Sequence, residues 1–305
     1  MARILVVGAG GGLGRAWTVR LAAPGLGLGP AFPGPLEVLA LPHEQLDISR
    51  RDQIEPVFDS FKPDVVLNCA GRTQVDACEA APWEAFLAHR DGAEHVARLA
   101  AARGALPVYF GSDLVFDGAR TIPYTEEDPP NPLGVYGDSK LAGELMTMKH
   151  AHRHLIVRSG WLYGHPGRHF LKIFEEGVLD GEILFGYDDQ LGQATHVGDF
   201  CDAVLHLLRS GREGRYHVAS AGRVTQFGVM KRLKQLLGLD KADLRPITRT
   251  TGGRHAIRPR FSVLDCTKMM EAGAILRSWE ERLGPYAEEC RRSARRDRDT
   301  KILNS

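Results

Sequence analysis

Tyr136 and Lys140 lie four residues apart and form the pair of side chains in this chain best suited to chemistry. On a helix, residues at this spacing lie on one face. There the ammonium group can favour ionisation of the phenol and lower its pKa from about 10 toward neutral pH. Ser112, in the stretch Gly111-Ser112-Asp113, adds a hydroxyl that can hydrogen-bond a carbonyl oxygen. The three residues predict a catalytic site that donates a proton to a carbonyl.

A glycine-rich turn near the N-terminus predicts a second part of the site. The short β-branched run Arg3 to Val7 leads into this turn, and a helical stretch from Arg15 to Leu21 follows it. Strand, glycine turn and helix in this order form the dinucleotide fingerprint, in which backbone amides and a helix N-terminus receive the pyrophosphate. The residues expected to contact the cofactor there are Gly8, Gly11, Gly12, Leu13 and Gly14.

The end of the second predicted strand bears on the choice of nicotinamide cofactor. This strand, near Leu36 to Leu41, ends in Pro42-His43-Glu44 with no acid directly after it. An acid there would hold the ribose 2′-hydroxyl of NAD, whereas a cation would suit the 2′-phosphate of NADP. Arg15 and His43 are the candidate phosphate contacts, although both could equally be solvated surface residues. The pattern favours NADPH and leaves NADH open.

The elements that must position these residues alternate between strand and helix. Such alternation predicts an α/β fold, a doubly wound Rossmann-type parallel sheet with a smaller C-terminal substrate-binding lobe. The helical stretches expected are 50–61, 82–102, 169–176, 197–209 and 226–237, and the later strands are 65–67, 106–110, 155–157 and 215–218. The expected division is a cofactor domain at 1–158 with late sheet elements from 195–222, a lobe from 159–194 and 223–288, and a charged tail at 289–305.

Three stretches with chemical potential each follow a predicted strand. Cys69-Ala70-Gly71 follows the third strand, and its small side chains would let the backbone approach a cofactor. Ser112 and Asp113 follow the fourth strand, and Trp161 follows the fifth. Because ligands of open α/β sheets bind at the carboxyl ends of the strands, we expect these residues to meet in one site.

Size and composition indicate an ordinary globular protein. The chain has 305 residues, 43% of them hydrophobic, and a net charge of +1, which gives no overall basic field for nucleic acid or a membrane surface. No apolar stretch approaches the roughly 20 residues that a bilayer span needs. Five scattered cysteines without a CxxC pair argue against a disulfide framework, so a cytoplasmic location is expected. We expect no metal ligands, since His150, His152 and His154 lack nearby cysteine or carboxylate partners.

These motifs together resemble the dTDP-4-dehydrorhamnose reductases, which are extended members of the short-chain dehydrogenase/reductase superfamily. The resemblance runs in order along nearly the whole chain. It is carried by Gly8 to Gly14, Leu46-Asp47-Ile48, Pro63 to Asn68, Val75-Asp76 with Glu79, Ser112 to Gly118, Pro123-Tyr124, Val135 to Glu144, Trp161 to Gly164, Asp188-Asp189-Gln190 with Gly192, and Arg258-Pro259 followed by Ser262, Leu264-Asp265 and Lys268.

The resemblance implies NAD(P)H-dependent reduction of the 4-keto group of a nucleotide-linked deoxysugar, most simply dTDP-4-dehydro-L-rhamnose. Tyr136 would be the acid, Lys140 would anchor the nicotinamide ribose, and Ser112 stands where the family usually has threonine. Asp113 and Trp161 would contact the sugar. Arg258 could hold the diphosphate through its fork of donors, or form an ordinary surface ion pair. The residues that would complete the cofactor site are Asp47, Ile48, Cys69, Ala70 and Gly71.

Several positions depart from the family pattern. His89 replaces the usual asparagine before Gly92, which affects local backbone support and any proton relay. Ala194 replaces a proline and Phe261 a polar residue, so the sugar pocket could differ. The Pro24 to Pro35 segment is longer than usual. Mg²⁺ and a metal-linked homodimer are implied by the resemblance alone, and no metal ligand can be matched residue by residue.

Two other functions remain open at this stage. The regulatory subunit of methionine adenosyltransferase resembles these reductases, so the chain could be a cofactor-binding regulatory protein without turnover. The chain could also be a different sugar-nucleotide enzyme, such as an epimerase or another 4-ketosugar reductase. Intact Ser112, Tyr136 and Lys140 favour catalysis, and the segments 161–164 and 258–268 favour the rhamnose-type reductase.

Overall fold

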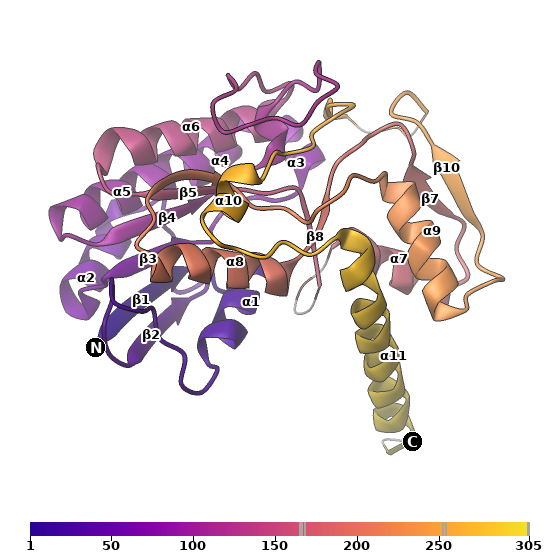
Figure 1. Cartoon of the computed structure of the whole chain (residues 1–305), viewed down its shortest axis with the longest axis horizontal. Coiled ribbons are helices and arrows are strands. Elements are labelled where there is room, and N and C mark those ends of the chain that lie inside the picture. Colours follow the sequence, from indigo (N-terminus) through magenta and orange to yellow (C-terminus); the bar gives the residue numbers. More distant parts are fainter. Residues whose placement is uncertain (165–166, 168, 252, 254, 304–305) are drawn as a thin grey trace.

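The chain folds around a six-stranded parallel sheet with the strand order β2-β1-β3-β4-β5-β9 (Figure 1). The computed structural model describes residues 1–164, 167, 169–251, 253 and 255–303. The strands of this sheet are β1 (Ala2–Val7), β2 (Leu36–Leu41), β3 (Val65–Asn68), β4 (Leu106–Phe110), β5 (Leu155–Arg158) and β9 (Gly214–His217). The order reverses between β1 and β3, which is the switch point of a doubly wound sheet. The predicted fold class is confirmed.

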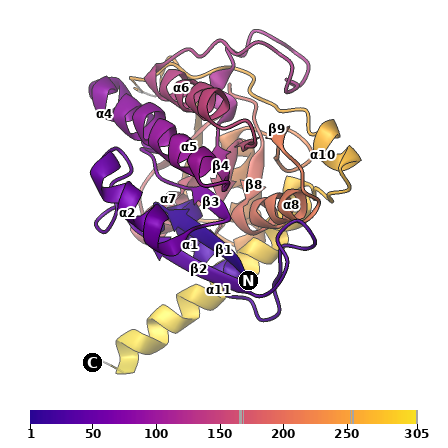
Figure 2. The ribbon, with the colours of Figure 1, turned by 90° about the vertical axis from the view of Figure 1, so that its left-hand side faces the viewer.

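Helices cover both faces of the sheet (Figures 1 and 2). They are α1 (Gly12–Leu21), α2 (Arg51–Phe61), α5 (Gly92–Ala102), α6 (Val135–His150) and α8 (Val197–Arg209). The short helices α3 (Val75–Ala80) and α4 (Pro82–Phe86) pack against α6. In β1, Ile4 and Val6 belong to the core beneath α1 and α8, whereas Leu5 and Val7 belong to the core beneath α2 and α5. Because side chains alternate along a strand, burial on both faces requires the continuous apolar runs seen in the sequence.

The stretch 82–102 is helical, but it is not the uninterrupted α-helix that the sequence predicted. A π-helical turn, η1 (Leu87–Asp91), separates α4 from α5. Within it the Gly92 N–H donates to the Leu87 carbonyl, five residues back instead of four. Such single π turns are frequent at functional sites. This one places His89 in the interior, with 1% of its surface exposed.

A smaller lobe carries two short sheets. Strand β6 (Trp161–Tyr163) pairs with β8 (Ala194–His196), and β7 (Leu184–Tyr187) pairs with β10 (Leu244–Ile247). Its helices are α7 (Phe170–Leu179), α9 (Gln226–Leu237) and α11 (Trp279–Leu303). Phe174, Leu233 and Tyr286, one from each helix, pack into one apolar cluster. This core is separate from the two clusters beneath the sheet.

The chain returns from the lobe to the sheet before it ends. Strand β9 pairs in parallel with β5 at the sheet edge, and the short helix α10 (Thr267–Glu271) lies against β9. The division into a cofactor domain and a substrate lobe by residue ranges stays a prediction. The segment expected as a charged tail continues α11 as a helix to Leu303, and this helix projects from the body (Figure 2).

Candidate active site

A cavity of about 440 Å³ lies at the carboxyl ends of β1, β3, β4 and β5. It brings together most of the residues that the sequence singled out. Those that line it are Gly11, Gly12, Leu13, Cys69, Ala70, Gly71, Ser112, Tyr136, Lys140 and Trp161. The predicted acid and the predicted cofactor turn therefore face one cavity.

The glycine turn is built so that backbone can approach backbone. Gly8 has φ +73°, and a methyl group added there would lie 2.5 Å from the Ala70 nitrogen. A methyl group at Gly14 would lie 2.3 Å from the Gly8 oxygen. Helix α1 begins at Gly12 without a side-chain cap and without an acid in its first turn. Its first amides can therefore receive an anion, which fits the pyrophosphate of a dinucleotide.

Gly8 and Gly14 pack within the glycine turn and do not line this cavity, and four further predicted cofactor residues do not line it either. Arg15 is exposed, and its Nε donates to the Gly10 carbonyl at 2.8 Å. His43 is also exposed. Asp47 accepts hydrogen bonds from the backbone N–H and the hydroxyl of Ser49, and Ile48 belongs to the core. Contact of these four residues with a cofactor remains a prediction.

Helix α6 carries Tyr136 and Lys140 and is fixed at its N-terminus by a neighbouring helix. The Val135 N–H donates to Glu79 Oε1 of α3 at 2.7 Å, which satisfies a helix-end donor that otherwise lacks a partner. A methyl group at Gly137 would lie 2.1 Å from the Leu114 oxygen, so the first turn of α6 packs directly on the segment after Ser112. The tyrosine is thereby held close to the end of β4.

The pKa of Tyr136 does not shift as the spacing predicted. Burial raises it well above the ordinary 10, and the nearby Asp113 carboxylate raises it further. A hydrogen bond with Ser112 lowers it only in part. The prediction that Lys140 brings this pKa toward neutrality is wrong for the site without ligands, because desolvation of the phenolate dominates. The phenol is protonated at neutral pH, which is the form that donates a proton.

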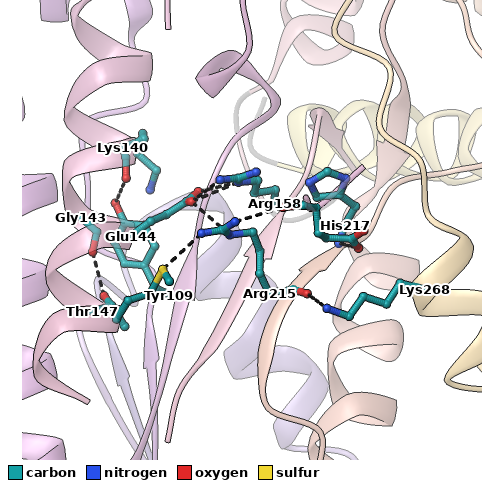
Figure 3. A network of polar contacts seen from close by, with 11 residues as sticks. Tyr109, Lys140, Gly143, Glu144, Thr147, Arg158, Arg215, His217 and Lys268 are labelled. Atoms are coloured by element: carbon teal, nitrogen blue, oxygen red, sulfur yellow. Dashed lines mark hydrogen bonds and ion pairs between the residues drawn. The ribbon is translucent and has the colours of Figure 1, made fainter. Parts of the chain in front are cut away.

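Lys140 is buried beside a network of polar side chains (Figure 3). Burial lowers its pKa to about 8, and the Glu144 carboxylate one turn further along α6 partly offsets this shift. The ammonium group lies 4.5 Å from the centroid of the Tyr109 ring. Behind it, Arg158 and Glu144 are both fully buried and form a forked pair, with Nη2 to Oε2 at 2.7 Å. The lysine is thus backed by a compensated pair instead of an isolated charge.

Ser112 is held in a chain of hydroxyl and carboxyl groups. Its Oγ accepts from the Leu114 N–H at 3.1 Å and donates to Asp113 Oδ1 at 3.2 Å. Asp113 is buried and also accepts from the Ser262 hydroxyl at 2.5 Å. Burial raises the pKa of Asp113 to about 6. Asp113 lines neither cavity of the site, so its direct contact with a sugar stays a prediction.

A second cavity of about 440 Å³ adjoins the first. Trp161 lines both cavities, and its indole packs so closely on Gly192 that a methyl group there would lie 2.8 Å from the ring. Arg258 lines the second cavity, where its guanidinium forms a fork with Asp76 at 2.7 and 3.1 Å. The sequence left open whether Arg258 binds a diphosphate or forms an ion pair. The ion pair is present, and it places a cation in the wall of this cavity.

Some residues of the site were missed from the sequence. Thr73 and Gln226 line both cavities, Ser159 lines the first, and Gln190 lines the second. The Ser159 hydroxyl and the Gln190 amide nitrogen are buried and have no hydrogen-bond partner among the described residues. A signal existed for three of them: Gln190 is itself part of the quoted stretch Asp188-Asp189-Gln190, and Thr73 and Ser159 stand two residues before the quoted Val75 and Trp161. Gln226 opens α9 and offered no such signal.

The fold and this site define a nicotinamide-dependent reductase. The RmlD substrate binding domain model matches residues 2–292. The chain belongs to this family, whose members are NAD(P)-dependent reductases. In the part of the chain that the structure describes, no cluster of three or more His, Cys, Asp or Glu side chains could hold a metal ion, and no helix is long and apolar enough to span a bilayer.

Similar proteins support this assignment over nearly the full length. The chain is 33% identical over 289 residues to the spore coat polysaccharide biosynthesis protein SpsK of Bacillus subtilis, covering 95% of this chain and 98% of that protein. It is 34% identical to a dTDP-4-dehydrorhamnose reductase of Streptomyces griseus, covering 92% and 91%. The structure of a dTDP-4-dehydrorhamnose reductase from Bacillus anthracis in complex with NADP superposes with a TM-score of 0.85 at 29% identity, covering 95% and 100%.

Proposed function

We propose that this chain reduces the 4-keto group of a dTDP-linked deoxysugar, converting dTDP-4-dehydro-L-rhamnose to dTDP-L-rhamnose with NADPH. The observation that carries the proposal is that Ser112, Tyr136 and Lys140 line the same cavity as the glycine turn. The names of the similar reductases support the sugar, and the NADP complex of the Bacillus anthracis protein supports the cofactor. The described cysteines are all free, as expected of a cytoplasmic enzyme.

The residues of this chain would act on the carbonyl oxygen. A nicotinamide held at the glycine turn would supply the hydride for the carbonyl carbon. Tyr136, protonated at neutral pH, donates its proton to the oxygen, and such acid assistance is typically worth about 10²- to 10⁴-fold in rate. Ser112 hydrogen-bonds the same oxygen as negative charge develops on it. Lys140 would anchor the nicotinamide ribose, which is the role that the resemblance gives it.

The second cavity would hold the nucleotide. Trp161 stands at the junction of the two cavities, where the sugar of a nucleotide sugar would lie against its indole. Arg258 lines the second cavity with its fork of donors paired to Asp76, and a phosphate that replaced this carboxylate could accept from the same fork. The sugar would thus lie between the hydride donor and the nucleotide site.

The test is a turnover assay on a panel of substrates. The pure protein is incubated with NADPH or NADH and with dTDP-4-dehydro-L-rhamnose, dTDP-4-keto-6-deoxy-D-glucose and the corresponding UDP sugars, while loss of nicotinamide absorbance and product identity are measured. We expect oxidation with the dTDP-linked rhamnose precursor. Tyr136→Phe should bind NADPH normally and lose most turnover. Tight cofactor binding without turnover on any sugar would refute the proposal and favour a regulatory protein.

A further inference from the structure

His89 joins three parts of the active site through one buried ring. It belongs to the π turn η1, and its imidazole lines the cofactor cavity. The Arg72 N–H donates to its Nε2 at 3.0 Å, and its Nδ1 lies 2.8 Å from Ser139 Oγ on α6. The ring edge also meets the ring of Tyr136, with centroids 5.6 Å apart and planes at 89°.

The protonation of this ring follows from its partners. A backbone N–H can only donate, so Nε2 must be the acceptor and the proton of a neutral ring must be on Nδ1. The Nδ1–H therefore donates to Ser139 Oγ, whose own hydroxyl donates to the Tyr136 carbonyl at 3.0 Å. The bonds form a directed chain from the loop after β3 to the backbone of the predicted acid. Burial and the Lys140 charge lower the pKa of His89 to about 2, so the ring stays neutral.

The surrounding backbone leaves the ring little freedom to move. A methyl group at Gly71 would lie 2.8 Å from His89 Nε2. One at Gly143 on α6 would lie 2.3 Å from the His89 carbonyl oxygen. The Gly71 contact restricts the ring, and the Gly143 contact packs the His89 backbone directly on α6. His89 therefore lies between the loop that lines the cofactor cavity and the helix that carries Tyr136, and a displacement of either part would strain one of the two hydrogen bonds of its ring.

We propose that His89 is a positioning residue that fixes Tyr136 relative to the cofactor loop, by linking the Arg72 backbone to Ser139 through a neutral imidazole. This role rests on the proposed function of Tyr136 as the acid. Loss of the link should leave the cavity and cofactor affinity intact while the phenol loses its alignment. Turnover should fall because misplacement of a reacting group by about 1 Å can cost a hundredfold in rate.

The kinetic test uses variants that separate the two hydrogen bonds. His89→Phe keeps a ring but removes both bonds, His89→Asn keeps a donor near Nδ1, and His89→Gln keeps an acceptor near Nε2. We expect His89→Phe to lower kcat at least tenfold while its dissociation constant for NADPH stays within threefold of wild type. His89→Asn and His89→Gln should lower kcat by less. Combining Ser139→Ala with His89→Phe should lower kcat no further than His89→Phe alone. His206→Phe, which removes one hydrogen bond to the Ala272 carbonyl away from the site, is the matched control and should leave kcat unchanged.

A second readout does not depend on turnover. In ¹⁵N-histidine NMR, His89 should show the neutral Nδ1–H tautomer without titration between pH 5 and 8, and Ser139→Ala should shift its Nδ1 signal. Normal kcat in His89→Phe, or equal losses of kcat and NADPH affinity, would overturn the positioning role. If wild type reduces no 4-ketosugar while the NMR pattern is present, the proposed function has failed instead. An imidazole that titrates in this range would refute the hydrogen-bond chain itself.

Discussion

Replacing Lys140 by methionine should stabilise the protein without ligands at neutral pH, although it removes a residue of the proposed site. Burial moves the pKa of Lys140 from its ordinary 10.5 to about 8. Such a shift corresponds to about 3 kcal/mol of unfavourable free energy for holding the charged form in the folded state. Methionine has a similar length, carries no charge and can keep the contact with the Tyr109 ring. We therefore expect Lys140→Met to raise the free energy of unfolding by about 2–3 kcal/mol at pH 7.

The sign of the pH dependence makes this prediction specific. Below pH 8 the lysine is charged in the folded and the unfolded protein, so wild type bears the full cost. Between about pH 8 and 10.5 the folded protein releases the proton while the unfolded chain keeps it. In this range the unfolding free energy of wild type should therefore rise, relative to that of Lys140→Met, by up to about 1.4 kcal/mol per pH unit.

The assay is urea unfolding of wild type and Lys140→Met at pH 7, 8, 9 and 10, without cofactor. The difference in unfolding free energy should be largest at pH 7 and nearly absent at pH 10. Lys149→Met, an exposed lysine on the same helix, is the control and should change stability by less than about 0.5 kcal/mol throughout. A difference in unfolding free energy that stays constant from pH 7 to 10 would refute the lowered pKa of Lys140.

Two further predictions concern the buried pair and the glycine turn. Arg158→Met leaves the buried Glu144 with Arg215 Nε at 3.8 Å as its ion-pair partner, and it should cost about 3 kcal/mol in urea unfolding. Arg158→Met combined with Glu144→Leu should recover most of that loss, and equal losses would contradict the pairing. Gly14→Ala places a methyl group 2.3 Å from the Gly8 oxygen and should lower the Tm of the protein without cofactor. In Gly11→Ala the nearest neighbour of the new methyl group lies at 3.5 Å, so this variant should keep the wild-type Tm. It should nevertheless bind NADPH more weakly in calorimetric titration. A normal Tm for Gly14→Ala would refute the close approach in this turn.

Much of the fold could be predicted because local signals agreed with one another. Apolar β-branched runs such as Val65 to Leu67 are typical of strands buried on both faces, and glycine spacing fixed the first turn. The π turn at Leu87 to Asp91 could not be predicted, since one extra residue in a hydrogen-bonded ring leaves little trace in helical periodicity. The contact between His89 and Ser139 joins residues fifty positions apart, and only the folded chain brings them together.

The sequence predicted which residues line the cavity better than it predicted the pKa shift of Tyr136. Spacing placed Tyr136 and Lys140 on one face, and both line the cavity. Spacing could not reveal how deeply the phenol is buried, and depth decides the direction of its pKa shift. Asp47 and Ile48 were named from a motif, and their contact with a cofactor stays a prediction: Asp47 accepts a hydrogen bond from the Ser49 N–H, and Ile48 is buried in the core.

The chain returns to the sheet at β9 after it has formed the first part of the lobe. This path restricts how the sheet and the lobe can move and evolve relative to one another. The polypeptide leaves the sheet after β5, comes back through α8 and β9, and departs again into α9. Several covalent connections therefore join the sheet to the lobe, and we expect any relative motion of the two to be a small shear instead of a wide swing about one hinge. Replacing one contiguous segment would not transfer the substrate specificity of a relative, because the lobe is built from separate stretches of sequence that would have to be replaced together.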